Sequence, residues 1–305
     1  MEKQRLVIIA GPTAVGKTGA SIRLASKRDG EIVSADSMQV YKRMDIGTAK
    51  VRVEEMKGIP HHLIDVIEPS EDYNVVRFKE MAKKAVADIS SRGKLPIICG
   101  GTGFYIQALL YDIDFTDEPD TDIREKLCDM YREKGELYMH ELLRKNDPES
   151  AEKIPVNNVK RVIRAIEFYE LHGRPISEHN RVERLKESVY DSRFFVLTDD
   201  RSVLYERINK RVDDMVKAGL FDEAEALIKE GIPRSSTAMQ GIGYREAYAY
   251  LSGEITRDEA IELIKRNSRH YAKRQLTWFR REKNVIEINI SKCGDIENEF
   301  EKYLW

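Results

Sequence analysis

The sequence predicts an α/β fold: a parallel sheet flanked by helices, with an inserted all-helical domain. Three observations predict it. Residues 11–18 form a glycine-rich segment directly after a short apolar run. Further apolar runs alternate with helical patterns, as strands and helices do in βαβ units. Residues 116–192 interrupt this alternation, because they carry helical periodicity and no strand-like run.

Composition and length exclude several classes of protein. A chain of 305 residues corresponds to about two domains, or one core with a large insertion. With 41% hydrophobic and 34% charged residues, it is not wholly disordered. No apolar run approaches the ~18 residues of a membrane span, so we expect a cytoplasmic protein with no membrane partner. Its three cysteines are far apart, and His61 and His62 have no further ligand at metal spacing, which argues against disulfide scaffolds and zinc sites.

The charge distribution says more than the net charge. The whole chain has a formal net charge of −2, yet residues 265–283 contain eight Lys and Arg against one acid, Glu282. A local basic stripe can bind a polyanion even on an acidic protein. A solvated helix face would show the same pattern, and the sequence leaves that alternative open.

Five apolar runs are the predicted strands of the core. A buried parallel strand is a short continuous apolar run bounded by turn residues. We therefore expect strands at 6–10, 32–34, 95–99, 194–197 and 285–290, with a helix at 75–89. In open parallel sheets, ligands bind at the carboxyl ends of the strands. The loops after the first three strands are thus the candidate site.

The inserted stretch has helical patterns at 123–132, 137–143, 150–153 and 159–171. We expect a core domain built from 1–115 and 193–305, and a helical insertion domain at 116–192. Where the chain returns to the core, apolar residues at helical spacing predict a packed helix that ends near Gly219. These residues are Leu204, Ile208, Val212, Met215 and Val216.

The strongest motif is a phosphate loop, G-x-x-x-x-G-K-S/T. Its glycines let backbone N–H groups curve around phosphate oxygens, and the helix that follows adds positive potential. Lys17 neutralises phosphate charge, and the Thr18 hydroxyl can hold Mg²⁺. The loop alone does not identify the polyphosphate, and a clear second-motif aspartate for an ATP-using kinase is missing. The loop residues are Gly11, Pro12, Thr13, Ala14, Val15, Gly16, Lys17 and Thr18.

Polar residues follow the next two strands. Asp36 comes directly after the second strand, where a carboxylate could bind magnesium, accept a proton or cap a turn. Gln39 could read an adenine edge through paired hydrogen bonds. The third strand ends at a glycine-rich turn that carries Thr102, where the backbone can approach a ligand closely or pack tightly.

In this order, the motifs resemble the bacterial tRNA dimethylallyltransferase family, also called the tRNA isopentenyltransferase or IPP transferase family. The similarity covers nearly the whole chain. Its segments are 11–18, 35–41, 59–63, 100–105, 158–165, 241–245 and 273–279. The resemblance implies a phosphate-loop kinase-like core with an inserted helical domain.

It also implies a reaction. Family members transfer a dimethylallyl group from dimethylallyl diphosphate to N6 of the adenosine 3′-adjacent to the anticodon of tRNA. The phosphate loop would then hold the donor diphosphate, with Arg211 reaching it and Mg²⁺ on Thr18. By similarity, Asp36 is the base, with Thr102 and Lys17 as further catalytic residues.

The resemblance further implies an interface with the anticodon stem-loop, on which the target base must be flipped out of its stack. Tyr244 is a candidate stacking ring, and Arg161 and Arg164 are candidate phosphate contacts. We expect the chain to act as a monomer. The residues that match tRNA-contact positions are Asp36, Ser37, Met38, Gln39, Thr102, Arg124, Lys160, Arg161, Val162, Ile163, Arg164, Met239, Gln240, Gly241, Ile242, Gly243 and Tyr244.

Two alternatives remain open from the sequence. One is an isopentenyltransferase that acts on free adenine nucleotides. The other is a phosphate-loop small-molecule kinase or nucleotide-binding switch without prenyl chemistry. The helical insertion, the basic stripe and segment 241–244 favour polymeric RNA over a free nucleotide.

Overall fold

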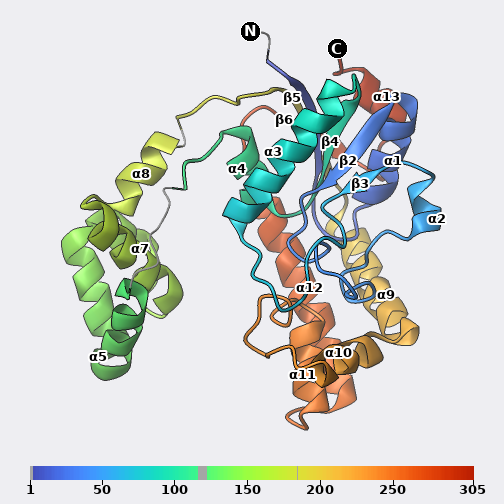
Figure 1. Cartoon of the computed structure of the whole chain (residues 1–305). Coiled ribbons are helices and arrows are strands. Elements are labelled where there is room, and N and C mark those ends of the chain that lie inside the picture. The colour runs from blue at the N-terminus through green and yellow to red at the C-terminus, as the bar shows by residue number, and fades with distance from the viewer. Residues whose placement is uncertain (1–2, 116–121, 184) are drawn as a thin grey trace. The chain divides into compact units, whose positions relative to one another are not determined.

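A computed structural model of the chain describes residues 3–115, 122–183 and 185–305. They form two compact units (Figure 1). Unit 1 consists of Met1–Asp112 and Ser188–Trp305, and unit 2 of Ile113–Glu187.

Unit 1 is built on a six-stranded sheet in the order β3-β2-β4-β1-β5-β6. Every neighbouring pair is parallel, which confirms the predicted fold class. The phosphate-loop strand β1 lies between β4 and β5. The strands are β1 (Arg5–Ala10), β2 (Gly30–Ser34), β3 (His61–His62), β4 (Leu95–Gly100), β5 (Asp191–Thr198) and β6 (Val285–Asn289).

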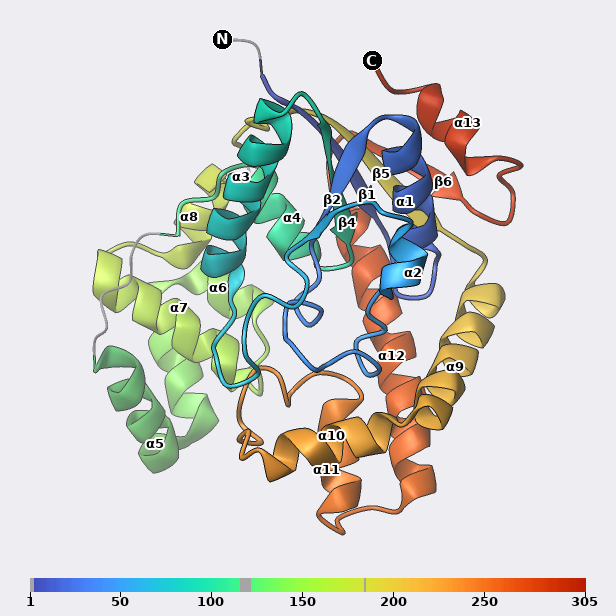
Figure 2. The same ribbon diagram turned by 45° about the vertical axis from the view of Figure 1, so that its right-hand side comes forward.

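Helices cover both faces of this sheet (Figures 1 and 2). Successive strand residues point to opposite faces. Leu6 and Ile8 of β1 therefore join one core cluster, while Val7 and Ile9 join the other. The first cluster includes residues of α3 (Val75–Ser91), α4 (Gly103–Leu110) and α12 (Arg257–Phe279); the second includes residues of α1 (Lys17–Lys27) and α13 (Ile296–Glu301).

Three further helices form a group with α12, in which two of them contact α12 and the third contacts those two. They are α9 (Arg201–Ala218), α10 (Leu220–Lys229) and α11 (Tyr244–Leu251). The predicted end of the first is confirmed, since Gly219 caps α9 in the left-handed conformation with φ 104°. A short helix, α2 (Val53–Met56), lies in the long connection between β2 and β3.

The regular elements among the described residues of unit 2 are all helices. Gly135, with φ 78° and ψ 177°, breaks α5 between the two helical patterns seen in the sequence. Helix α8 was not expected, because only two of its eight residues, Ile176 and Val182, are apolar, which is too few to form a helical pattern. The helices are α5 (Ile123–Asn146), α6 (Pro148–Lys153), α7 (Val159–His172) and α8 (Ile176–Glu183).

The limits of the units can be compared with the expected domain boundaries. The expected boundary at 116 lies outside the described residues. At the other side, unit 1 resumes at Ser188 and β5 already begins at Asp191, ahead of the expected boundary at 193. The first three residues of β5 are polar and pair with the start of β1, so the apolar pattern begins only at Phe194.

Strand β3 was also missed, since two residues are too short to form a pattern. Its histidines have structural partners: His61 Nδ1 lies 2.8 Å from the Ile59 carbonyl oxygen, and His62 Nε2 lies 2.8 Å from Glu31 Oε2. Within the described ranges, no helix is long and apolar enough to cross a membrane.

Candidate active site

The phosphate loop leaves β1 at a point where a side chain has no room. Gly11 has φ 146°, and a Cβ there would lie 2.4 Å from the Leu197 carbonyl oxygen. Gly16, with φ 98°, turns the chain into α1. These conformations explain why glycine stands at both positions. The first N–H groups of α1 have no partner within the helix and face the loop, which makes this end an anion site.

Lys17 is the cation of this loop. Its Nζ donates a hydrogen bond of 2.8 Å to the Pro12 carbonyl oxygen. Burial lowers the pKa of Lys17 to about 8; the Arg211 cation also lowers it, while Cys99 and Asp36 raise it. An anion bound in the loop would raise this pKa again by favouring the charged form.

Asp36 lies immediately beyond β2, with one oxygen engaged and one free. Its Oδ1 accepts backbone N–H bonds from Met38 at 2.8 Å and Gln39 at 3.3 Å. This turn holds the carboxylate in a fixed orientation. Its Oδ2 makes no hydrogen bond to any residue that the structure describes.

The structure brings Thr102 next to Asp36. The Thr102 N–H donates to the Ala35 carbonyl oxygen at 3.2 Å, so the start of α4 lies against the end of β2. The two segments approach so closely that a Cβ on Gly100 would lie 2.2 Å from the same oxygen. The Thr102 hydroxyl is buried, and no described residue gives it a hydrogen bond of good geometry.

Gln275 of α12 ties the phosphate loop to this turn. Its Oε1 accepts the Thr13 N–H at 2.9 Å, and its Nε2 donates to the Gly101 carbonyl oxygen at 3.0 Å. The sequence analysis missed this role, because it treated the region as a basic stripe. The available signal was an uncharged polar residue on the apolar face of a helix, in register with Ala272 and Phe279.

A cavity of about 360 Å³ opens between these elements, within the size range of small-molecule sites. Thr13, Asp36 and Arg211 line its polar part, and Arg211 Nη1 donates to Thr13 Oγ1 at 3.3 Å. Tyr271 also lines it; burial and the charge of Asp36 raise the pKa of this phenol to about 12. The apolar lining residues are Ile208, Val212, Met215, Ile242 and Ile264.

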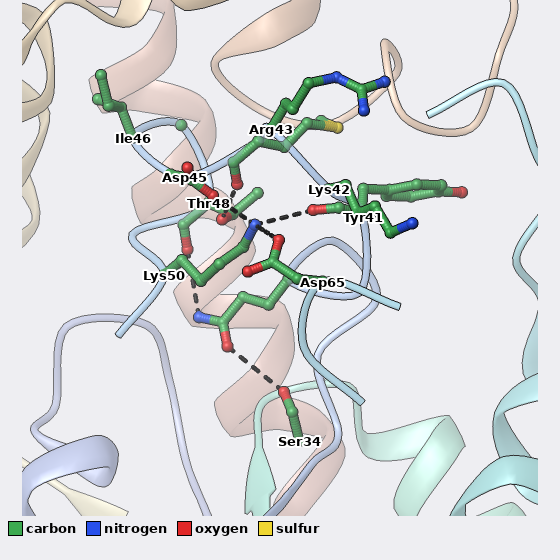
Figure 3. Close-up of polar contacts among 12 residues, drawn as sticks. Ser34, Tyr41, Lys42, Arg43, Asp45, Ile46, Thr48, Lys50 and Asp65 are labelled. Carbon is green, nitrogen blue, oxygen red and sulfur yellow. Dashed lines mark hydrogen bonds and ion pairs between the residues drawn. The ribbon is translucent and has the colours of Figure 1, made fainter. Parts of the chain in front are cut away.

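Residues 47–49 line another part of the cavity, and they belong to a loop at 44–50 that polar contacts hold in place (Figure 3). Gln39 Nε2 donates to the Thr48 and Ala49 carbonyl oxygens at 3.3 and 3.4 Å, and Ser34 Oγ donates to Gln39 Oε1 at 3.4 Å. The Gln39 amide is therefore already engaged with the protein. To read an adenine edge it would have to exchange these bonds.

Segment 239–244 reaches the cavity differently from the expectation. Residues 240–244 line the cavity, but the Met239 side chain is fully buried. Tyr244 is 0% exposed, and its hydroxyl donates to Glu223 Oε1 at 2.5 Å. The expectation of a stacking ring at Tyr244 does not fit this geometry, because the ring is packed inside the protein.

The remaining candidates lie in unit 2. Lys160 and Arg161 are exposed on α7. Arg124 Nε and Arg164 Nη1 each lie 3.2 Å from the buried Glu167 carboxylate. The side chains of Val162 and Ile163 belong to the helical core of unit 2. The cationic side chains are thus the part of this segment presented to solvent.

Comparisons with known proteins agree with the geometry. Residues 39–282 match the family model described as IPP transferase. The tRNA dimethylallyltransferase of Lachnoclostridium phytofermentans is 55% identical, over 94% of this chain and 92% of its own length. That of Acetivibrio thermocellus is 51% identical, over 93% and 91%.

Solved structures are similar as well. The tRNA isopentenylpyrophosphate transferase from Bacillus halodurans is 45% identical with a TM-score of 0.74, covering 98% of this chain and 96% of its own. A eukaryotic dimethylallyltransferase described as acting on tRNA is 31% identical with a TM-score of 0.83, covering 98% and 77%. These findings confirm the resemblance and the enzyme class predicted from the motifs. The chain belongs to the IPP transferase family, whose matched bacterial members are tRNA dimethylallyltransferases.

Proposed function

We propose that this chain transfers a dimethylallyl group from dimethylallyl diphosphate to N6 of the adenosine 3′-adjacent to the anticodon in tRNA. One observation carries the proposal. Thr13 of the phosphate loop, Arg211 and Asp36 line one cavity, and one Asp36 oxygen has no hydrogen bond to a described residue, which supports a site shared by the donor diphosphate and the base.

On the donor side, the loop residues bind the diphosphate. The N–H groups of 13–18, Lys17 and Arg211 stabilise the negative charge that collects on it as the allylic C–O bond breaks. These groups are oriented before the reaction begins, since Gln275 and Arg211 both hold Thr13. Their stabilisation thus needs little rearrangement.

Magnesium fits this site as a companion of the diphosphate. Among the described residues, no group of three or more His, Cys, Asp or Glu could hold a metal ion by itself. Thr18, exposed in the first turn of α1, would supply a hydroxyl ligand, and phosphate oxygens would supply others. Bound there, Mg²⁺ would neutralise charge on the leaving diphosphate.

On the acceptor side, N6 forms its bond to the allylic carbon while diphosphate leaves, and Asp36 Oδ2 takes the N6 proton. The exocyclic amine of adenine is a poor nucleophile, so orientation and exclusion of water contribute as much as the base. The Thr102 hydroxyl, which has no hydrogen bond of good geometry to a described residue, would form one with the target adenine.

The tRNA would deliver this adenosine as a flipped base, which costs a few kcal/mol of unstacking. Residues 36–38 and 240–244 line the cavity that would receive it. In unit 2, the exposed Lys160 and Arg161, with Arg124 and Arg164, would contact the phosphate backbone of the anticodon stem-loop.

The test is incubation of the purified chain with Mg²⁺, labelled dimethylallyl diphosphate and either unmodified tRNA or AMP. Label in tRNA, mapped to the base beside the anticodon, is the expected result. Label in AMP alone would move the chain to the free-nucleotide branch. No transfer to either acceptor, with ATP hydrolysed instead, would overturn the prenyl chemistry while leaving the phosphate loop as assigned.

A further inference from the structure

Glu223 of α10 binds two segments of the cavity wall at once. Its Oε2 accepts the N–H groups of Asp45 and Ile46, each at 2.8 Å, and its Oε1 accepts the N–H of Gly47 at 3.0 Å. The Tyr244 hydroxyl donates to the same Oε1 at 2.5 Å. One half-buried carboxylate therefore satisfies three successive backbone donors and a buried phenol.

This arrangement depends on the negative charge of Glu223. Three consecutive N–H groups that converge on one point form a concave anion site in the backbone. Hydrogen bonds to a charged acceptor are about twice as strong as those between neutral groups. A glutamine in its place would turn its side-chain NH2 group toward backbone N–H groups of this loop. Both partners would then be donors, and no hydrogen bond could form between them.

The loop at 45–47 and Tyr244 are joined through Glu223, and they also touch each other directly. A Cβ on Gly47 would lie 2.5 Å from the Tyr244 ring, so the loop rests on this ring with no space between them. Burial, followed by the neighbouring Glu223 charge, raises the pKa of Tyr244, which remains a hydrogen-bond donor at any working pH.

The inner side of the same loop is held by other residues (Figure 3). Gln39 donates to two of its carbonyl oxygens, and Thr48 Oγ1 donates to the Met44 carbonyl oxygen at 2.6 Å. Lys50 Nζ, nearly buried, contacts the Tyr41 carbonyl oxygen and the carboxylates of Asp45 and Asp65. Glu223 is the residue that binds the backbone N–H groups of residues 45–47.

We propose that Glu223 is a positioning residue for the acceptor adenosine. It fixes residues 47–49 and 241–244, which line the same cavity as Asp36, and so sets the width of the space for the flipped base. It contacts none of the phosphate-loop residues, which Gln275 and Arg211 hold instead. This inference rests on the proposed function, because it concerns the acceptor in that reaction.

The test compares Glu223→Gln with wild type at saturating and limiting concentrations of each substrate. We expect the KM for tRNA to rise about tenfold or more, as loss of a charged hydrogen-bond acceptor implies. The KM for dimethylallyl diphosphate should stay within about twofold, since the donor side keeps its anchors. Amide hydrogen exchange at 45–47 should become faster in the variant.

Two further variants keep the test decisive. Glu225→Gln removes a carboxylate from the same helix that, among the described residues, pairs with Lys229 on the helix surface, and it should change neither KM. Tyr244→Phe keeps the ring under Gly47 and removes one of the four donors, so it should raise the KM for tRNA by a smaller factor even if Glu223→Gln fails to fold.

The inference is overturned if Glu223→Gln speeds exchange at 45–47 but leaves the KM for tRNA unchanged, or if both KM values rise together with a lower Tm. Failure of the proposed function would look different, because the wild-type chain itself would then form no prenylated tRNA. Failure of the inference appears in the KM of the variant relative to that of wild type. Failure of the proposed function appears in wild type alone.

Discussion

At the scale of single residues, Asp36 and Lys17 owe their properties to their immediate surroundings. In the turn around Asp36, one carboxylate oxygen accepts backbone hydrogen bonds, and the other has no hydrogen bond to a described residue. The space under the phosphate loop removes water from Lys17 and lowers its pKa. The same side chains on an exposed surface would have neither property.

Replacing Asp36 separates its two tasks. Asp36→Asn keeps Oδ1 as an acceptor for the turn but cannot take a proton, so kcat should fall by about 10²–10⁴ while tRNA affinity is largely kept. Asp36→Ala also removes the acceptor that holds the turn. Any fall in kcat beyond that of Asp36→Asn measures the contribution of the turn. Single-turnover transfer and tRNA binding check both. Loss of tRNA binding in Asp36→Asn would mean that Asp36 organises the site instead of acting as base.

The lowered pKa of Lys17 predicts a pH dependence of donor binding. In the free protein Lys17 is charged below its pKa of about 8 and loses its charge above it. A bound diphosphate raises that pKa, so affinity is complete below pH 8 and weakens as pH rises, by up to about tenfold per pH unit. Calorimetric titration with inorganic diphosphate measures this. Lys17→Arg should remove the dependence, and a flat wild-type profile would contradict the assignment.

At the scale of elements, α12 has two distinct faces. Its exposed face carries part of the basic stripe, for example Lys273 and Arg274. Its other face buries Gln275 between the phosphate loop and the β4–α4 turn. The helix therefore holds the phosphate loop and the β4–α4 turn together through an uncharged side chain, and this role is independent of its basic residues.

Gln275→Ala should loosen the donor side of the cavity. Thr13 and Gly101 each lose a buried partner, and we expect the KM for dimethylallyl diphosphate to rise about tenfold with little change in the KM for tRNA. Thr277→Ala, an exposed change on the same helix, is the matched control. Steady-state kinetics with each substrate varied decides the matter. An equal rise in both KM values would show only that α12 is destabilised.

At the scale of the whole molecule, a buried charge network and the candidate site lie at opposite ends of β2. Glu31 of β2 is 2% exposed and binds Arg92, His62 and Lys94. This network lies at the start of β2, whereas the candidate site lies beyond the carboxyl ends of the strands.

The Glu31 network predicts how stability depends on pH. The hydrogen bond from Arg92, followed by those from His62 and Lys94, lowers the pKa of Glu31 from 4.5 to about 2 against the effect of burial. A lowered folded-state pKa gives stability that is present above about pH 4.5 and lost as pH falls toward 2. At neutral pH, Glu31→Gln should cost about 3 kcal/mol, and less in acid. Urea unfolding at several pH values tests this; a cost that does not change with pH would contradict it.

The tRNA interface predicts a dependence on salt. Each phosphate contact releases counterions, so the logarithm of affinity should fall steeply with the logarithm of salt concentration, by ~0.7–0.9 per contact. The double variant Lys160→Ala, Arg161→Ala should reduce this slope by about 1–2. Lys153→Ala, whose side chain pairs with Glu149 in the same unit, should not. An unchanged slope in the double variant would remove α7 from the interface.

The sequence by itself determined the fold class, the phosphate loop, most strands and the position of Asp36, because periodicity and motif chemistry reside in consecutive residues. The tertiary structure alone decided which distant residues meet. Gln275 lies 262 positions from Thr13, Arg211 lies 198 from it, and Glu223 lies 176 from Gly47. Those contacts depend on the strand order and on how α9, α10 and α12 pack, and no local pattern encodes either. The same packing buries Tyr244, which the sequence could equally present as a surface ring.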